Sequence, residues 1–466
     1  MTTPIPEIPA LSSLGRVHFI AIGGAGMSGV AAGYLSRGVE VTGSDQMDSE
    51  ALVALGAKGA KVWVGHDPAH LEGVDTVVVS SAIRDNNVEL VEARRRGLPI
   101  LHRSLALACL MEGDTVVSVA GTHGKTTTTA MCVAGLQGAH CDPSYVIGGT
   151  ILATGVGAHI GGDPVFVVEA DESDGSFLQY PTSVAVIPSL EADHLDYWET
   201  PLRYAQGFEE FASRDCVSAV VVDGDNPGTR SLGETLAAQG RRVVTYGESE
   251  ACEVRLTQIE MSADSSRTTL VGPGWSASLR LRVPGIHNLH DAAAAVCVCA
   301  VLGADRDGFL AGLADFGGTA RRFQRLGCAR AVLVVDDYAH HPTEVAATIT
   351  AARLVAGQGR VLVCFQPHLY TRTRDFAQEF GKALCGADEV VVLDVYPARE
   401  DPIPGVTGEL IADAVRSCGV IVHYVPRLED AAASIEPLAR PGDVVLTVGA
   451  GSVTQVGPAL LDLLEA

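Results

Sequence analysis

The segment 121–127 carries the residue types that bind a triphosphate. It reads Gly-Thr-His-Gly-Lys-Thr-Thr after the β-branched run 117–120, which predicts a strand, a phosphate loop and a helix. The glycines let backbone N–H groups turn toward phosphate oxygens, Lys125 can reach the outer phosphates, and the Thr126 hydroxyl can hold Mg²⁺. The glycines are closer together than in the usual loop, so an ordinary strand-to-helix turn is the alternative. We favour the phosphate loop because one of only four lysines in the chain occupies the diagnostic position.

A group of carboxylates follows the predicted strand 164–168. Its members are Glu169, Asp171, Glu172 and Asp174. Such a group is costly unless a cation neutralises it, and Mg²⁺ is the cation that a triphosphate brings. A solvated acidic loop is the alternative. His194 follows the predicted strand 183–188 and is either a second metal ligand or a structural hydrogen-bond partner, and its residue type alone leaves both open.

A second glycine-rich turn begins the first strand–helix unit of the chain. Residues 24–29 fit the pattern GxGxxG after the predicted strand 17–22, and the next strand ends in an acidic residue. The pattern is typical of a Rossmann-like domain, where a pyrophosphate lies on the helix N-terminus and the acidic residue binds a ribose. It leaves the kind of nucleotide open, and close strand-to-helix packing is the alternative. The candidate ligand-binding residues of this unit are Gly24, Ala25, Gly26, Met27, Ser28, Asp45, Ser80 and Ser81.

The elements that position these residues alternate between strand and helix, which predicts an α/β fold. We expect a Rossmann-like domain at 1–112, a central α/β domain of the P-loop ATPase type at 113–322, and a second Rossmann-like, doubly wound domain at 323–466. The alternating stretch 252–283 predicts an antiparallel extension. Strands are predicted at 17–22, 39–45, 76–80, 117–120, 164–168, 183–188, 219–222, 242–246, 331–335, 360–365, 389–393, 420–425 and 443–448.

Polar side chains follow three strands of the last predicted domain, in the segments 336–342, 366–374 and 449–452. The carboxyl ends of parallel strands meet at one edge of a sheet, so we expect these segments to lie close together. In the central domain, His287 and Asn288 precede an alanine-rich helix. They either bind a purine or cap that helix.

The composition restricts the class of partner. The formal net charge is −23, with 47% hydrophobic and 19% charged residues, so nucleic acid and anionic membrane surfaces are not expected as partners. The longest apolar run, 292–304, is shorter than the about 20 residues that a bilayer-spanning helix needs. No signal peptide is evident. The eleven cysteines include no CxxC pair, so we expect reduced thiols in a cytoplasmic protein.

A phosphate loop beside a carboxylate group indicates hydrolysis or transfer from a nucleoside triphosphate, and the two flanking units indicate two further substrates. An enzyme of this kind activates a carboxylate as an acyl phosphate, which an amine then attacks. A nicotinamide-dependent oxidoreductase would use Gly24, Gly26 and Asp45, but it would leave Lys125 and the carboxylates unexplained. A non-catalytic nucleotide-binding scaffold is the third possibility.

The order of these motifs resembles the Mur ligases of peptidoglycan synthesis over nearly the whole chain. The resemblance rests on the segments 23–29, 121–127, 169–172, 191–194, 287–288, 321–323, 337–344 and 366–375. The Asp-Tyr-x-His-His-Pro signature is similar to that of the branch whose substrates are UDP-N-acetylmuramate, L-alanine and ATP, and to that of a branch that reattaches recycled tripeptide. The glycine-rich turn at 23–29 favours the former branch.

The resemblance implies a role for each motif. The three domains would bind, in order, the UDP-sugar, ATP and the amino acid. Nucleotide binding is implied for Gly121, Thr122, His123, Gly124, Lys125, Thr126, Thr127, His287, Asn288, Arg322 and Asp337. Mg²⁺ binding is implied for Thr126, Glu169 and His194, substrate binding for His340, His368 and Arg372, and a catalytic role for Lys125, Glu169, His194 and Arg372.

Three positions depart from the pattern of this family. Leu369 stands where many members have arginine, and Asp291 and Ser189 stand where asparagine is frequent. A carbamylated lysine bridges the metal ions in some members. It is not expected here, because Lys125 is the only lysine between residues 114 and 322.

Overall fold

The computed structural model describes residues 7–398 and 400–465, which form two compact units. Unit 1 contains the described residues up to Thr257, together with Thr269–Ala277 and His290–Asp315. Unit 2 contains Gln258–Thr268, Ser278–Leu289 and the described residues from Phe316 onward. The described residues form three sheets with helices between their strands, which confirms the predicted α/β class.

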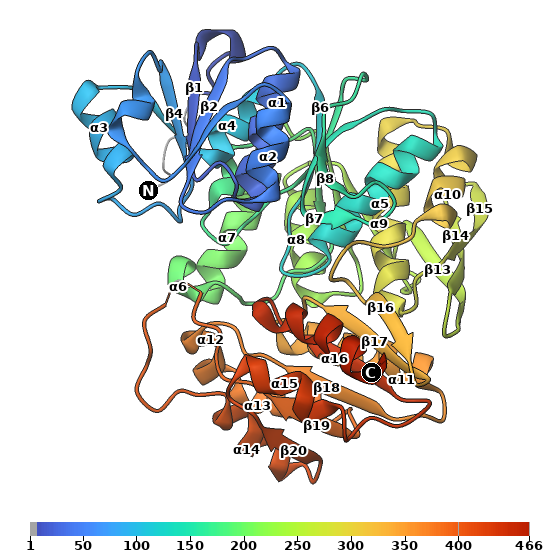
Figure 1. The fold of residues 1–466 in the computed structure, drawn as a ribbon. Helices are drawn as coiled ribbons and strands as arrows, with labels where there is room; N and C mark the ends of the chain where they lie inside the picture. Colours follow the sequence, from blue (N-terminus) through green and yellow to red (C-terminus); the bar gives the residue numbers. More distant parts are fainter. Residues whose placement is uncertain (1–6, 399, 466) are drawn as a thin grey trace. The chain divides into compact units, whose positions relative to one another are not determined.

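The first sheet of unit 1 is a five-stranded parallel sheet with the order β3-β2-β1-β4-β5. Figure 1 labels β1, β2 and β4 of this sheet. Its strands are β1 (Val17–Ile20), β2 (Val41–Asp45), β3 (Lys61–Val64), β4 (Thr76–Val79) and β5 (Ile100–His102). Its helices are α1 (Ala25–Ser36), α2 (Glu50–Ala57), α3 (Val88–Arg96) and α4 (Arg103–Leu110), with short 3₁₀ turns η1 (Leu11–Ser13) and η2 (Pro68–Leu71). The strand order reverses between β1 and β4, and ligands of such folds bind at that point. The glycine-rich turn follows β1 there.

The second sheet has ten strands in the order β15-β14-β13-β12-β11-β10-β6-β9-β7-β8. Its centre is β6 (Thr115–Val119), which pairs in parallel with β9 (Val165–Glu169) and β10 (Val184–Ile187). After Thr115 every residue of β6 is buried, as its valine-rich sequence predicts. The other strands are β7 (Ser144–Ile151), β8 (Val156–His159), β11 (Ala219–Asp223), β12 (Val243–Gly247), β13 (Val254–Met261), β14 (Ser266–Gly272) and β15 (Trp275–Leu281).

The strands β13, β14 and β15 are neighbours in that sheet and are joined by residues 262–265 and 273–274. Connections this short join antiparallel strands, so the predicted extension is confirmed. The helices of this part are α5 (Lys125–Gly138), α6 (Leu195–Trp198), α7 (Pro201–Ala212), α8 (Pro227–Ala238), α9 (Ile286–Leu302) and α10 (Arg306–Asp315), with the 3₁₀ turn η3 (Ser176–Gln179).

Helix α5, which begins at Lys125, packs closely on α10. Gly138 on α5 lies against Gly308 and Gly312 on α10. A Cβ atom added at Gly312 would overlap the carbonyl oxygen of Ala134. These glycines therefore allow the two helix backbones to approach each other, and this packing fixes the helix that starts at the phosphate loop.

The sheet of unit 2 has six strands in the order β16-β17-β21-β18-β19-β20. Figure 1 labels these strands except β21. The strands are β16 (Gln324–Ala329), β17 (Val332–Asp337), β18 (Val361–Phe365), β19 (Glu389–Val392), β20 (Ile421–Tyr424) and β21 (Val444–Val448). All pairs are parallel except β16 with β17. The helices are α11 (Pro342–Ala356), α12 (Tyr370–Asp375), α13 (Ala377–Leu384), α14 (Glu409–Ser417), α15 (Leu428–Ile435) and α16 (Val456–Glu465), with the 3₁₀ turn η4 (Ser452–Gln455).

The three polar segments of unit 2 meet at one sheet edge, as predicted. The amide of Gln366 donates to the carbonyl of Val448 at 3.0 Å, and the amide of Gly449 donates to the carbonyl of Asp337 at 3.0 Å. The segments following β17, β18 and β21 are therefore adjacent.

The prediction that every cysteine is reduced is wrong for one pair. Cys385 and Cys418 form a disulfide, while nine other cysteines are free thiols. Cys385 follows α13 and Cys418 follows α14, and packing of these two helices brings the cysteines together. Residues that distant along the chain give no spacing signal in the sequence.

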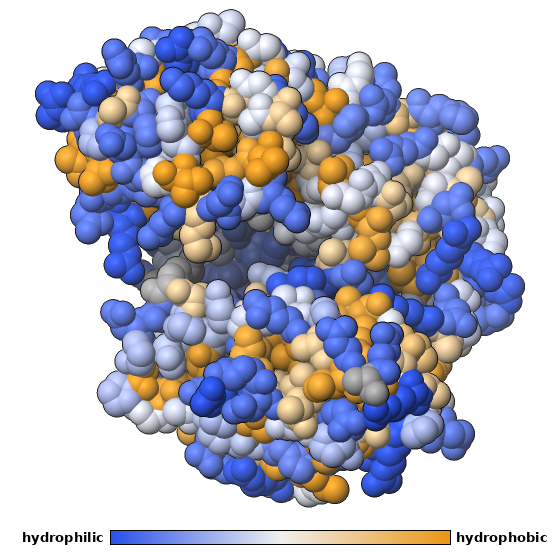
Figure 2. All heavy atoms as spheres, viewed as in Figure 1, coloured by the Kyte–Doolittle hydropathy of each residue, from blue (hydrophilic) through white to orange (hydrophobic). Residues whose placement is uncertain are grey.

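Hydrophilic residues surround small groups of hydrophobic ones on the face drawn in Figure 2. Among the described residues, no helix combines the length and the apolarity that crossing a bilayer requires. Burial is instead concentrated around the sheets, in clusters that include Phe166 and Phe177 in unit 1 and Val363 and Phe365 in unit 2.

Candidate functional site

The loop 121–124 has the backbone that a phosphate cradle needs. Gly121 and Gly124 have φ values of +150° and +80°, which side chains other than glycine rarely adopt. A Cβ atom at Gly124 would lie 2.6 Å from Asp291 Oδ1, and one at Gly121 would lie 2.9 Å from the carbonyl of Ser189. Glycine is therefore required at both positions by conformation and by space.

Two residues that depart from the family pattern hold this loop. The Ser189 hydroxyl accepts from the amide of His123 at 2.6 Å and lies 3.0 Å from the His123 carbonyl, to which it donates. The Thr128 hydroxyl donates to Asp291 Oδ1 at 2.9 Å. Ser189 therefore hydrogen-bonds to the loop itself, whereas Asp291 accepts from the helix α5 that follows the loop, and both side chains are buried.

Lys125 lies folded onto its own loop. Its Nζ donates to the carbonyls of Gly121 and Thr122 at 2.5 and 3.3 Å, and to Glu172 Oε1 at 2.9 Å. Burial lowers the pKa of Lys125, but Glu172, Asp171 and Glu169 outweigh it and raise that pKa. The lysine is therefore a cation surrounded by carboxylates.

Glu172 is completely buried, and its second oxygen, Oε2, has no hydrogen-bond partner among the described residues. Burial raises the pKa of Glu172 to about 7, although Lys125 opposes that shift. The sequence placed Glu172 in the carboxylate group without a separate role. Only the structure distinguishes it, since its partner Lys125 is remote along the chain.

The two expected metal ligands Thr126 and Glu169 are in contact. The Thr126 hydroxyl donates to Glu169 Oε1 at 3.0 Å, and the amide of Gly148 donates to Glu169 Oε2 at 2.7 Å. His194 has a φ of +52°, and its Nε2 lies 3.6 Å from Glu172 Oε1. A hydroxyl, carboxylates and an imidazole thus gather beside the loop, and the oxygen donors suit Mg²⁺.

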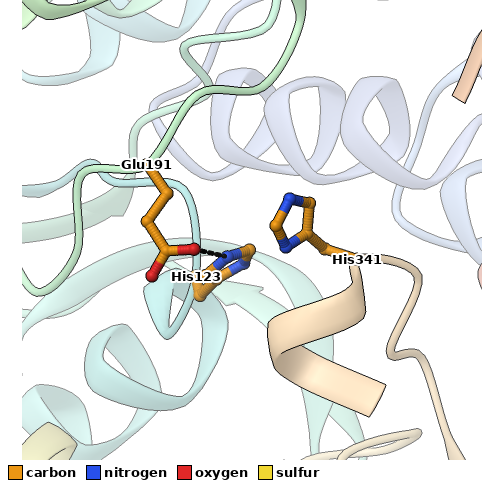
Figure 3. Close-up of side chains that lie close together, drawn as sticks. All are labelled: His123, Glu191 and His341. Atoms are coloured by element: carbon orange, nitrogen blue, oxygen red, sulfur yellow. Dashed lines mark ion pairs between the residues drawn. The ribbon is translucent and has the colours of Figure 1, made fainter. Parts of the chain in front are cut away.

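The other expected loop residues have structural contacts. The Thr122 hydroxyl donates to the carbonyl of Glu191 and accepts from its amide, each at 2.9 Å. Figure 3 shows Glu191 directed toward His123, with 3.5 Å between Oε2 and Nε2. Thr127 is buried. In unit 2, the side-chain Nδ2 of Asn288 donates to the carbonyl of Pro284 at 2.7 Å and lies 3.2 Å from His287 Nε2.

The glycine-rich turn of the first sheet is fixed by Asp45. Its Oδ2 accepts from the amide of Gly23 at 2.9 Å. Gly24 is the N-cap of α1, and a Cβ at Gly26 would overlap the guanidinium of Arg103. The turn therefore lies beside a cation that the sequence analysis did not identify, since Arg103 belongs to no recognisable motif.

The remaining candidates of this turn lie in its first helix and after β4. Met27 is buried and Ser28 is half-buried, whereas the side chain of Ala25 lies outside the described part of the structure. Ser80 and Ser81 directly follow β4, and Ser81 is exposed.

A buried carboxylate in the same sheet has three histidine neighbours. Glu89 Oε1 lies 2.7 Å from His70 Nδ1, and Oε2 lies 3.2 Å from His66 Nδ1 and 3.5 Å from His18 Nε2. Ser44 donates to Oε2 at 2.5 Å. Burial alone would raise the pKa of Glu89, but His18, Ser44 and His70 lower it to about 2. These residues come from separate elements, so no sequence motif predicts the cluster.

In unit 2, Asp337 holds the segment that leads into the sheet. Its Oδ2 accepts from the amide of Phe323 and its Oδ1 from the amide of Ala339, each at 2.7 Å. Burial raises the pKa of Asp337 to about 6, against the effect of Arg322. The guanidinium of Arg322 lies 5.1 Å from the centre of the Tyr338 ring. Asp337 and Arg322, which the family resemblance both assigns to nucleotide binding, are thus neighbours in unit 2.

Three predicted substrate-binding residues also come together in unit 2. The ring of His340 lies 6.0 Å from that of His368, and Arg372 Nη1 lies 3.5 Å from His368 Nδ1. The Tyr396 ring stacks on His368 at 5.8 Å, a contact that the sequence analysis missed. Leu369 has a φ of +69° and its amide donates to the Tyr396 carbonyl at 3.0 Å. At the position where many family members have arginine, Leu369 therefore joins the two segments through its backbone conformation and its backbone hydrogen bond.

Three family models match successive parts of the chain. They are described as the Mur ligase family catalytic domain, over residues 16–115, the Mur ligase middle domain, over 119–299, and the Mur ligase glutamate ligase domain, over 321–451. Together they account for most of the sequence.

Full-length relatives give the same result. A UDP-N-acetylmuramate–L-alanine ligase from Cutibacterium acnes is 58% identical, over 97% of each chain. The solved structure of UDP-N-acetylmuramate-alanine ligase MurC from Thermotoga maritima matches with a TM-score of 0.80 and 30% identity, over 96% of this chain and 98% of that one. A murein peptide ligase from Psychrobacter arcticus matches with a TM-score of 0.70 over 97% and 99% of the chains, but at 22% identity it shows the fold alone.

Proposed function

The chain belongs to the Mur ligase family, and we propose that it is the ATP-dependent ligase that joins L-alanine to UDP-N-acetylmuramate. In this reaction, a lactyl carboxylate oxygen bonds to the γ-phosphorus of ATP and ADP leaves. The amine nitrogen of L-alanine then bonds to the carboxyl carbon, phosphate leaves, and the amine gives up a proton. The observation that carries the proposal is the contact of Lys125, Thr126 and the carboxylates at one glycine loop.

Within this proposal, the loop 121–127 binds the phosphates of ATP. Gly121 and Gly124 allow backbone N–H groups to face the phosphates, and Lys125 neutralises charge on the transferred phosphoryl group. His287, Asn288, Arg322 and Asp337 are assigned to the rest of the nucleotide. These assignments are supported by residue chemistry and by the family resemblance.

Mg²⁺ is the proposed ion, and the residues present fit it. A hydroxyl on Thr126 and a carboxylate on Glu169 are oxygen donors in mutual contact, and the buried Glu172 Oε2 has no hydrogen-bond partner among the described residues. Bound there, Mg²⁺ would neutralise negative charge on the phosphates. We assign Thr126 and Glu169 to one ion and His194 to a second.

The sugar nucleotide is assigned to the first sheet, through Gly24–Ser28, Asp45, Ser80 and Ser81, and the amino acid to His340, His368 and Arg372. We propose domain boundaries at 112/113 and 322/323, because the three sheets draw their strands from 17–102, 115–281 and 324–448. A cytoplasmic location is also part of the proposal, supported by the nine free thiols.

The deciding experiment measures phosphate release by the purified chain. We expect release only when UDP-N-acetylmuramate, L-alanine, ATP and Mg²⁺ are all present. Release with tripeptide in place of L-alanine would instead identify the recycling ligase, the runner-up. A chain that binds nicotinamide dinucleotide and releases no phosphate with either acceptor would contradict the proposal.

A further inference from the structure

Lys125 cannot bind a phosphate from the position that it occupies in this structure. An ammonium group has three N–H donors, and the Nζ of Lys125 has three acceptors, namely two carbonyls of its own loop and Glu172 Oε1. A phosphate oxygen can therefore be bound only after one of these contacts is released. The contact with Glu172 is the only one of the three that involves a charged partner.

Releasing Glu172 is unfavourable unless a proton or another positive charge replaces Lys125. The Glu172 side chain is completely buried, and a buried carboxylate that loses its cation is strongly destabilising. The Trp198 indole donates to the backbone carbonyl of Glu172 at 2.9 Å, which holds the backbone of this residue in place. Asp171 and Glu169 add further negative charge around Lys125.

We infer that Glu172 is a positioning residue that makes nucleotide binding depend on a divalent cation. The Lys125 side chain moves from Glu172 to the phosphates when a divalent cation supplies the positive charge beside Glu172 in place of Lys125. Without the cation, binding leaves either the phosphates without Lys125 or Glu172 without a partner. This inference rests on the proposed binding of ATP at residues 121–127.

The first test is the affinity for a non-hydrolysable ATP analogue, measured by titration calorimetry with Mg²⁺ and with a chelator. In the wild-type chain we expect much weaker binding in the chelator. Glu172→Gln removes the charge that retains Lys125, so its binding in the chelator should be at least about tenfold tighter than that of the wild type. Glu172→Asp keeps the charge and should keep the dependence on Mg²⁺.

The matched control is Glu169→Gln, which removes a proposed Mg²⁺ ligand. This variant should bind the analogue more weakly than the wild type in Mg²⁺, which makes the difference between its affinities in Mg²⁺ and in the chelator smaller. Unlike Glu172→Gln, it should not bind more tightly in the chelator. The inference would be overturned if the affinities of Glu172→Gln in Mg²⁺ and in the chelator had the same ratio as those of the wild type. It would also be overturned if this variant bound the analogue more weakly than the wild type in both conditions. A wild-type chain that binds no adenine nucleotide in either condition would overturn the proposed function and this inference together.

A second measurement needs no variant at Glu172. The chain has four lysines, so labelling lysine with ¹³C at the ε carbon gives few signals, and Lys125→Arg identifies the signal of Lys125. At a saturating concentration of the analogue, we expect the chemical shift of the Lys125 signal to change only when Mg²⁺ is also present. An equal movement with the analogue and chelator would contradict the inference, whatever the stability of the Glu172 variants.

Discussion

At the scale of single residues, we predict that turnover depends strongly on Lys125. If it neutralises charge on the transferred phosphoryl group, Lys125→Ala should lower kcat by about 10²–10³ or more, because a charge-stabilising donor is lost from the transition state. Steady-state phosphate release measures this effect. The matched control is Lys58→Ala, which removes an exposed lysine and should leave kcat unchanged. Equal rates for Lys125→Ala and the wild type would contradict this role for Lys125.

Glu89 predicts a specific loss of stability in acid. Its pKa is lowered from 4.5 to about 2, so its ionised form stabilises the folded chain above about pH 4.5 and that contribution disappears as the pH falls toward 2. The contribution is on the order of 3 kcal/mol. The difference in free energy of unfolding between the wild type and Glu89→Gln should therefore shrink over this window. Ser44→Ala, which removes one donor, should move the loss to higher pH, and parallel pH profiles for all three chains would contradict the assignment.

Residue chemistry predicted the components of the site better than their contacts. Lys125, Thr126 and Glu169 were identified from loop and carboxylate motifs, and the structure places Thr126 against Glu169. The contact of Lys125 with Glu172 was not foreseen, because it depends on how β6 and β9 align in the sheet. Ser189 was noted only as a departure from the family pattern, and its hydrogen bond to the loop becomes visible only in three dimensions.

At the scale of elements, the close packing of α5 on α10 predicts a cost for any side chain at Gly312. A Cβ there overlaps the backbone of α5, so Gly312→Ala should destabilise the chain by about 1–3 kcal/mol. The control is Gly56→Ala in α2, where the new Cβ would lie 3.6 Å from Val62, an ordinary contact. That change should be neutral or stabilising by up to about 1 kcal/mol, since alanine favours a helix more than glycine does. Thermal unfolding would compare the two, and equal melting temperatures would contradict the packing argument.

The start of α11 positions His340. Glu344 Oε2 accepts from the amides of His340 and His341 at 2.9 and 3.2 Å. Glu344→Ala should therefore cost about 1 kcal/mol of stability and raise the KM for L-alanine more than the KM for ATP. Glu344→Gln keeps an acceptor oxygen and should lie close to the wild type. If the two substitutions raised the KM for L-alanine equally, charge rather than helix capping would be responsible.

Four of the five strands that the sequence failed to predict share one physical property. The strands β3, β5, β8 and β16 were missed, and each lies at the edge of its sheet, as does β20, which was predicted. Central parallel strands are buried on both faces and show a continuous apolar run, whereas edge strands are half-exposed and lose that signal. The pattern of β3 is an example, since none of its residues is fully buried. The fifth missed strand, β7, lies between β8 and β9 and contains two glycines that weaken its apolar run.

At the scale of the whole molecule, the net charge of −23 predicts how the rate depends on salt. ATP and the UDP-sugar are anions and are repelled at long range, whereas L-alanine is a zwitterion. The Debye length falls from about 30 Å at 0.01 M to about 8 Å at 0.15 M ionic strength, so added KCl screens this repulsion. We expect kcat/KM for the two nucleotides to rise several-fold over that range, while kcat/KM for L-alanine, measured in the same assay, stays constant. A fall for the nucleotides would mean that local cations such as Lys125 and Arg103, rather than the field of the whole chain, control their approach.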